Sequence, residues 1–191
     1  RLGLDRVNQM LADLGYRETR LKTTTGELFR KVWERADPGL AALSDRQVFE
    51  RGFPTDSGAA ARSFTFQGDS TQWLGRSTAR EIARLLEQIH NGDLASRQSS
   101  DEMIGILRRQ FYASRLPRFI GFGAPVAHKT GDWPPHAGND VGIIYGPGGP
   151  IVVAVFATQN RGSFVQLEET IGRIAQDLLD AWGQAAGAQS Q

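Results

Sequence analysis

The spacing of apolar residues predicts the main helices of this chain. Near its start, apolar residues at intervals of three and four indicate a short amphipathic helix that stops before Gly15. These residues are Leu4, Val7, Leu11 and Leu14. Residues 26–35 and 44–51 predict further, shorter helices, and residues 53–68, rich in Gly, Ser, Ala and Thr, are typical of a long surface loop.

Two stronger helical patterns follow and predict a helical layer. In the first, Thr78 and Glu81 have capping-box spacing and an apolar stripe runs to Asn91, before Gly92. The stripe consists of Ile82, Leu85, Leu86 and Ile89. The second pattern starts at a box of Ser99 with Glu102, closes near Pro117 and has an inward face made of Met103, Ile104, Leu107 and Phe111.

After Pro117 the pattern changes from helical to β-rich. Short strands are predicted at residues 126–130, 141–145 and 151–158, and the Gly-Pro-Gly-Gly run at 146–149 makes the last two a hairpin. A long helix from 164 to about 182 then has one apolar face suited to cover a sheet, formed by Leu167, Ile171, Ile174, Leu178 and Trp182. Residues 185–191 are predicted to be a disordered tail. Helices first and antiparallel strands later predict an α+β fold.

Composition excludes several classes of function. The net charge is +1, from 22 basic and 21 acidic residues without a long single-sign run, so we expect no nucleic-acid partner. The chain has no cysteine, which excludes disulfides and thiolate catalysis. No apolar run approaches the roughly 20 residues of a membrane span. A helical repeat begins within the first residues, without an initiator Met or a signal-peptide pattern, which suggests a piece of a longer product.

The stretch from His128 to Trp133 carries the candidate chemistry, because a cation, a hydroxyl and a glycine follow a short apolar run there. Residues 123–130 have the spacing of a phosphate-binding loop with one substitution. That interpretation fails because His128 replaces the glycine before the lysine, and Pro125 has no N–H to offer a phosphate.

A metal site is the second interpretation of the same region. It would combine His90, His128 and His136 with Asp132 or Asp140, but these residues share no helical face and no known ligand spacing. We therefore expect neither a metal nor another cofactor. The third interpretation is a solvated strand lysine, Lys129, beside a routine β-forming threonine. A Lys-Thr-Gly triplet alone does not exclude this.

A longer match gives the triplet a context. The segments Val126-Ala-His-Lys-Thr-Gly131, Gly138-Asn-Asp-Val-Gly-Ile-Ile-Tyr145 and Ile151-Val-Val-Ala-Val-Phe-Ala-Thr158 resemble the terminal strands of class A β-lactamases and related penicillin-recognising serine hydrolases. Residues 77–89 resemble the helix after that family's active-site loop. Residues 2–21, with Thr19-Arg20-Leu21 at their end, resemble the helix that leads into the loop.

The resemblance covers nearly all of the chain except residues 22–72. It implies a β-lactamase-like fold in which residues 1–117 are the remainder of the helical subdomain with its active-site loop. Residues 118–184 would be three antiparallel strands and the closing helix of the α/β subdomain. A periplasmic or secreted protein is also implied, although the sequence shows no signal peptide.

The resemblance also implies roles for four residues. Lys129 would place a fixed positive charge near the substrate carboxylate, and Thr130 would donate its hydroxyl to that carboxylate. Gly131 would let the substrate approach the backbone, and the backbone N–H of Asp132 would form half of an oxyanion hole. An acidic side chain at Asp132 should repel anionic substrates unless it points away or meets a cation. Alternation puts Lys129 and Thr130 on opposite faces, so both reach one ligand only from an edge strand.

Two motifs of the family do not occur in this sequence. A Ser-x-x-Lys nucleophile is absent, since Lys22, Lys31 and Lys129 follow Thr19, Leu28 and Val126 at that spacing. The second motif, Ser-x-Asn or Tyr-x-Asn, is absent as well. We expect both motifs upstream of Arg1 or in a second chain. Without that part of the protein, the strand of Lys129 and the helix after Ser77 should expose apolar surface.

The deacylating glutamate is a third departure. The family's Glu-x-x-Leu-Asn segment is missing, and the nearest carboxylate, Glu27, fits better as an ordinary first-turn helix glutamate. Without a general base, an acyl-enzyme persists.

We expect a serine hydrolase that opens a β-lactam amide. The alternative is a slowly acylating or non-catalytic module that recognises peptidoglycan-type or protein partners.

Overall fold

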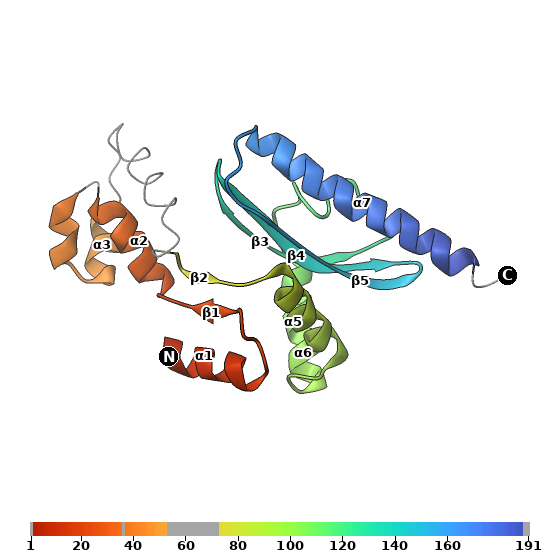
Figure 1. Cartoon of the computed structure of the whole chain (residues 1–191), viewed down its shortest axis with the longest axis horizontal. Helices are drawn as coiled ribbons and strands as arrows, with labels where there is room; N and C mark the ends of the chain where they lie inside the picture. The colour runs from red at the N-terminus through yellow and green to blue at the C-terminus, as the bar shows by residue number, and fades with distance from the viewer. Residues whose placement is uncertain (1, 36, 53–72, 189–191) are drawn as a thin grey trace. The chain divides into compact units, whose positions relative to one another are not determined.

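The computed structural model describes residues 2–35, 37–52 and 73–188, which belong to two compact units, Arg1–Ser77 and Thr78–Gln191 (Figure 1). The loop predicted at residues 53–68 lies outside the described residues. The assignment of residues 1–117 and 118–184 to two subdomains concerns the layout of whole family members and stays a prediction.

In the first unit, helix α1 (Leu4–Asp13) is tied to a two-stranded antiparallel sheet of β1 (Arg20–Leu21) and β2 (Gly75–Arg76). The Asn8 side chain makes this connection, because its amide donates to the Leu21 carbonyl and its oxygen accepts from the Leu21 N–H, both at 2.8 Å. One asparagine thus satisfies both backbone groups of a strand residue.

Three further helices complete the described part of this unit: α2 (Thr25–Glu34), η1 (Pro38–Ala42) and α3 (Asp45–Arg51). The helices predicted at 26–35 and 44–51 are therefore confirmed. Ser44 and Gln47 form a reciprocal capping box at the start of α3. The core between these three helices is formed by one fully buried apolar residue from each of them: Val32, Leu40 and Val48.

The second unit is built on an antiparallel sheet of three strands in the order β3 (Val126–Trp133), β4 (Ala137–Gly146) and β5 (Gly149–Ala157). The predicted hairpin between the last two is confirmed, and Gly149 adopts the positive φ of 105° that its turn requires. Strand β3 is longer than predicted because its pairing with β4 continues to Trp133 opposite Ala137.

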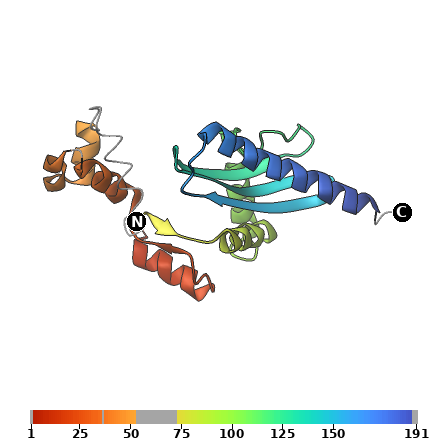
Figure 2. The same ribbon diagram turned by 45° about the horizontal axis from the view of Figure 1, so that its top comes forward.

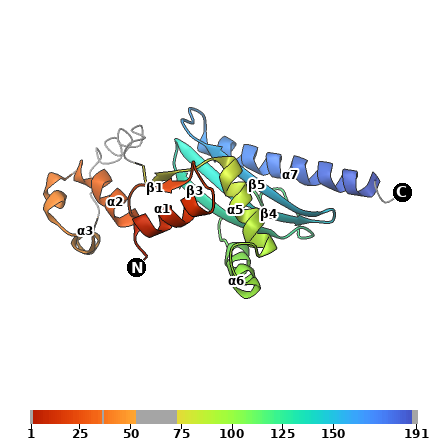
Figure 3. The same ribbon diagram turned by 60° about the horizontal axis from the view of Figure 1, so that its bottom comes forward.

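Helices cover both faces of this sheet, as the predicted α+β layers require. Helix α7 (Phe164–Ala188) lies along one face, whereas α5 (Ala79–Asn91) and α6 (Arg97–Arg108) lie against the other (Figures 1 and 2). Figure 3 shows α5 crossing the sheet on the side opposite α7. Within the described residues, no helix is both long enough and apolar enough to cross a bilayer.

The interface between α7 and the sheet differs from the predicted one. Its buried residues are Leu116, Ala124, Ile144, Val153, Ile171 and Ala175, with Leu167 and Leu179 packed against them. The contact thus follows positions four apart on α7, as expected for a ridge inclined to the helix axis. Ile174 and Leu178, predicted to face the sheet, are instead 38% and 42% exposed.

The start and end of α6 were also predicted wrongly. Its N-cap is Ser96, whose hydroxyl accepts from the Ser99 N–H at 3.2 Å, so Ser99 lies inside the helix. The helix ends at Arg108, well before Pro117. Phe111, predicted to face inward, lies beyond this end and is 86% exposed.

The predicted tail is helical as far as residue 188, because α7 continues to Ala188. Trp182 Nε1 donates to the Gly148 carbonyl at 2.7 Å and holds this end of the helix to the β4–β5 turn. Alanines at positions 185, 186 and 188 favour helix.

The predicted apolar surface is found in part. On α5, Leu86 is buried by described residues, whereas Ile82, Leu85 and Ile89 are half-buried. On β3, Val126 and Trp133 are half-buried as well.

Candidate active site

The Lys-Thr-Gly triplet lies on β3, an edge strand of the three-stranded sheet. The N–H of Tyr145 donates to the Pro125 carbonyl at 2.9 Å, which makes that pair the hydrogen-bonded kind. Hydrogen-bonded and non-hydrogen-bonded pairs alternate along an antiparallel ladder. When this alternation is followed from Pro125 along the register, the even-numbered residues of β3 direct their backbone N–H and C=O groups away from β4. Thr130 and Asp132 are two of these residues.

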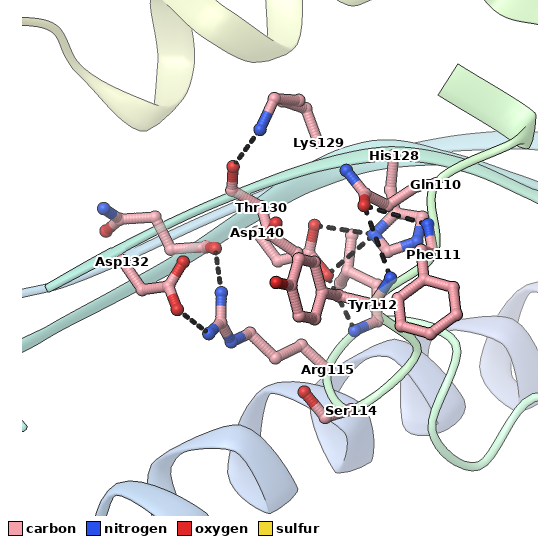
Figure 4. A network of polar contacts seen from close by, with 12 residues as sticks. Gln110, Phe111, Tyr112, Ser114, Arg115, His128, Lys129, Thr130, Asp132 and Asp140 are labelled. Carbon is pink, nitrogen blue, oxygen red and sulfur yellow. Dashed lines mark hydrogen bonds and ion pairs between the residues drawn. The ribbon is translucent and has the colours of Figure 1, made fainter. Parts of the chain in front are cut away.

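Lys129 brings its charge to this open edge. Its side chain is exposed on one face of the sheet, and its Nζ donates to the Thr130 carbonyl at 2.6 Å (Figure 4). Since that carbonyl points away from β4, the ammonium group lies at the edge. A cation and the outward N–H of Asp132 therefore lie along the same side of one strand.

Thr130 and Asp132 place their side chains on the opposite face, next to α7. Thr130 is 7% exposed, whereas Lys129 is exposed, so the two side chains separate as strict alternation predicts. At Gly131, an added Cβ would meet nothing within 4 Å. Described residues therefore leave the strand open to a ligand at this point.

The Asp132 carboxylate meets a cation. Arg115 Nη2 donates to Asp132 Oδ2 at 2.9 Å and lies 3.2 Å from Glu168 Oε1 on α7. Arg115 Nη1 donates to the Asn139 carbonyl at 3.0 Å, and the arginine side chain is only 3% exposed (Figure 4). The expected repulsion of anionic substrates by Asp132 is thus opposed by a buried guanidinium.

A second buried pair supports β3 from the same face. His128 Nδ1 lies 2.9 Å from Asp140 Oδ1, and the Leu116 N–H donates to Asp140 Oδ2 at 3.0 Å. His128 is 2% exposed and Asp140 is fully buried. The pair joins two strands to the segment before β3. Among described residues, no group of three or more acidic or histidine side chains is placed to hold a metal ion.

Glu27 has the geometry of a helix-start glutamate. Its N–H donates to the Thr24 hydroxyl at 3.2 Å, and its carboxylate pairs with Lys31, one turn later, at 3.0 Å. The nearby Thr23 side chain and, after it, the Lys31 ammonium lower the pKa of Glu27. A lowered pKa makes a carboxylate a weaker base, which argues against Glu27 as a deacylating base.

The sequence patterns did not single out Arg115. It lies in the irregular segment after α6, 17 positions before Asp132, and no local motif marks it. The only signal for it in the sequence was the Asp132 carboxylate, because an acidic side chain on a strand that binds anions must point away or meet a cation. Asp140 was considered only as a metal ligand, since it lies one residue before the strand predicted at 141–145; in the structure β4 starts earlier and Asp140 pairs opposite Thr130.

Comparisons with known proteins give the family and the fold of the chain. Residues 1–182 match the model of the "Beta-lactamase enzyme family". The crystal structure of a β-lactamase from Sphaerobacter thermophilus DSM 20745 is similar with a TM-score of 0.65 and 25% identity, covering 95% of this chain and 54% of that one. No curated protein matches the sequence.

Two other structures support the fold alone. A β-lactamase from Chitinophaga pinensis DSM 2588 has a TM-score of 0.67 at 22% identity, over 94% of this chain and 55% of that one. PBP-A has a TM-score of 0.64 at 20% identity, over 95% and 52%. The chain therefore spans about half the length of the structures it matches. Since the family model matches almost its whole length, the chain belongs to the beta-lactamase enzyme family.

Proposed function

We propose that this chain is the substrate-recognising part of a serine hydrolase that opens β-lactam amides through an acyl-enzyme. The observation that carries the proposal is the open edge of β3, where the Lys129 ammonium and the outward N–H of Asp132 lie along one side. A β-lactam offers a carboxylate and an amide carbonyl at a short, fixed separation. A cation and an N–H donor from residues three positions apart on a strand fit those groups.

Each residue of the proposed site has a separate task. Lys129 attracts the substrate carboxylate, and the Thr130 hydroxyl, whose side chain lies on the other face of β3, donates a hydrogen bond to that carboxylate around the open edge of the strand. Gly131 lets the ring approach the backbone closely. The Asp132 N–H stabilises the negative charge that develops on the carbonyl oxygen during attack, a contribution of about 3 kcal/mol for one such donor.

The nucleophile of the proposed reaction comes from outside these 191 residues. In the proposed reaction, a serine in a Ser-x-x-Lys segment, upstream of Arg1 or in a second chain, attacks the β-lactam carbonyl. The C–N bond breaks, the nitrogen takes up a proton, and the acyl group stays on the serine. We propose a periplasmic or secreted location on the family resemblance alone.

A slowly acylating or non-catalytic module is the second candidate. It is favoured by the lowered pKa of Glu27 and by the absence of a Glu-x-x-Leu-Asn segment from the sequence. Without an effective base to activate water, a penicilloyl-enzyme would accumulate, and a module without any nucleophile would only bind peptidoglycan-type or protein partners.

Intact-mass measurement of the full-length protein after incubation with penicillin tests the proposal. A mass increase of one penicillin supports acylation, and its absence at saturating ligand favours the binding module. Turnover of a chromogenic cephalosporin then separates a hydrolase from a slow acylator.

Lys129→Gln should raise the half-saturating β-lactam concentration about 10- to 100-fold, the loss expected from one charge-assisted contact. Lys31→Gln removes a lysine that pairs with Glu27 in the first unit and should leave this concentration unchanged. Equal behaviour of the two variants would count against the proposed site.

A further inference from the structure

The carboxyl end of β3 is held on one side only. Strand β4 pairs with it on one edge, and no described strand pairs with the other. Gly131 adds no side-chain packing just before Asp132, and a two-proline turn follows Trp133. The peptide that carries the Asp132 N–H is thus held by the backbone ladder on its β4 side, and only side-chain contacts can restrain it further.

Arg115 supplies those contacts from the α7 face. One of its terminal nitrogens binds the Asp132 carboxylate, and the other binds the carbonyl of Asn139, the residue paired with Gly131. A single planar group thus joins β3 and β4 at adjacent rungs. A guanidinium holds such a two-pronged geometry, which a flexible ammonium does not.

The guanidinium is itself fixed. Glu168 Oε1 on α7 lies 3.2 Å from Arg115 Nη2 and accepts from the Ser114 hydroxyl at 2.6 Å. The centroid of the Phe164 ring lies 5.4 Å from the guanidinium carbon of Arg115. Because Arg115 is 3% exposed, solvent screens these interactions little.

We propose that Arg115 is a positioning residue that orients the Asp132 N–H toward the substrate carbonyl by holding the Asp132 side chain on the opposite face of β3. The inference rests on the proposed function of that N–H as an oxyanion donor. Arg115 touches neither substrate nor nucleophile in this role. A displacement of about 1 Å at such a donor can cost about 100-fold in rate.

Arg115 has a second effect that is separable from the first. Asp132 is 37% exposed, and its charge would repel an anionic substrate if Arg115 did not oppose it. The charge effect acts on substrate binding, whereas the geometric effect acts on acylation at saturation. A lysine at position 115 keeps the charge and loses the two-pronged contact.

The test compares Arg115→Lys and Arg115→Gln with wild type in the full-length protein, by the rate of labelling with a fluorescent penicillin. Arg115→Lys should lower the saturating rate about 10- to 100-fold and leave the half-saturating concentration within about threefold. Arg115→Gln should lower the rate equally and also raise the half-saturating concentration. Arg173→Gln, which breaks an exposed pair with Glu169 on α7, should change neither.

A second measurement does not depend on activity. The NMR order parameter of the Asp132 amide should fall from about 0.85, the value of rigid backbone, toward 0.6 in Arg115→Lys. An unchanged order parameter, or an undiminished saturating rate in this variant, would overturn the positioning role. A wild-type protein that takes no label at saturation would instead overturn the proposed function, and the role with it.

Discussion

The interface between α7 and the sheet offers a matched pair of substitutions on one helix. Ile171 is 1% exposed and packs among Leu116, Ile144 and Val153, whereas Ile174, one turn later, is 38% exposed. Replacing either isoleucine by alanine removes the same three carbon atoms from the same helix. The two variants therefore differ in burial and in little else.

The expected losses follow from that difference. Three buried carbons at about 0.8 kcal/mol each, plus a residual cavity, give about 3 kcal/mol for Ile171→Ala after a small gain in helix propensity. Ile174→Ala should cost about 1 kcal/mol, because more than a third of the residue is already in water and no closed cavity forms.

Urea denaturation of the full-length protein, followed by circular dichroism, measures both. With a slope near 2 kcal/mol/M, a difference of about 2 kcal/mol places the Ile171→Ala midpoint about 1 M below that of Ile174→Ala. Equal midpoints, or a larger loss of stability for Ile174→Ala, would refute the conclusion that α7 contacts the sheet through positions four apart.

Three other substitutions test the second unit by the same assay. Asp140→Ala should cost about 3 kcal/mol or more, because it leaves the buried His128 imidazole without its acceptor; a loss below 1 kcal/mol would contradict this. Gly142→Ala should destabilise strongly, since its Cβ would lie 2.5 Å from the Ala127 carbonyl oxygen, and a neutral result would count against the register. Burial raises the pKa of Tyr145, so the stability that its neutral phenol contributes is present below pH 10 and lost as the pH rises through the folded-state pKa. Tyr145→Phe should therefore flatten the fall in stability above about pH 10, and an unchanged alkaline slope would oppose this.

Local patterns predicted the elements whose signals lie within a few residues. Thr78 caps α5 by accepting from the Glu81 N–H, as the capping-box spacing indicated. The glycine turn produced the β4–β5 hairpin. At α6, three serines within five residues offered competing caps, and the structure uses Ser96 as the cap where the sequence pattern predicted Ser99.

Features set by tertiary contacts were not predictable in the same way. Apolar spacing on α7 could not distinguish Ile174 from Ala175, since both lie near the same stripe and alanine is too small to mark a seam. The strand motif could be assigned from sequence. Its support by Arg115 could not, because that residue belongs to an irregular segment whose path depends on α7.

The contacts of Arg115 also set the order in which this part of the chain can change. If Asp132 is replaced first, the buried guanidinium keeps Glu168 at 3.2 Å and the cation remains compensated. If Arg115 is replaced first, two carboxylates lose their shared partner at once. Variants that lose both residues should therefore be reached through the Asp132 substitution, and directed evolution toward a neutral residue at position 132 should leave Arg115 in place in its early rounds.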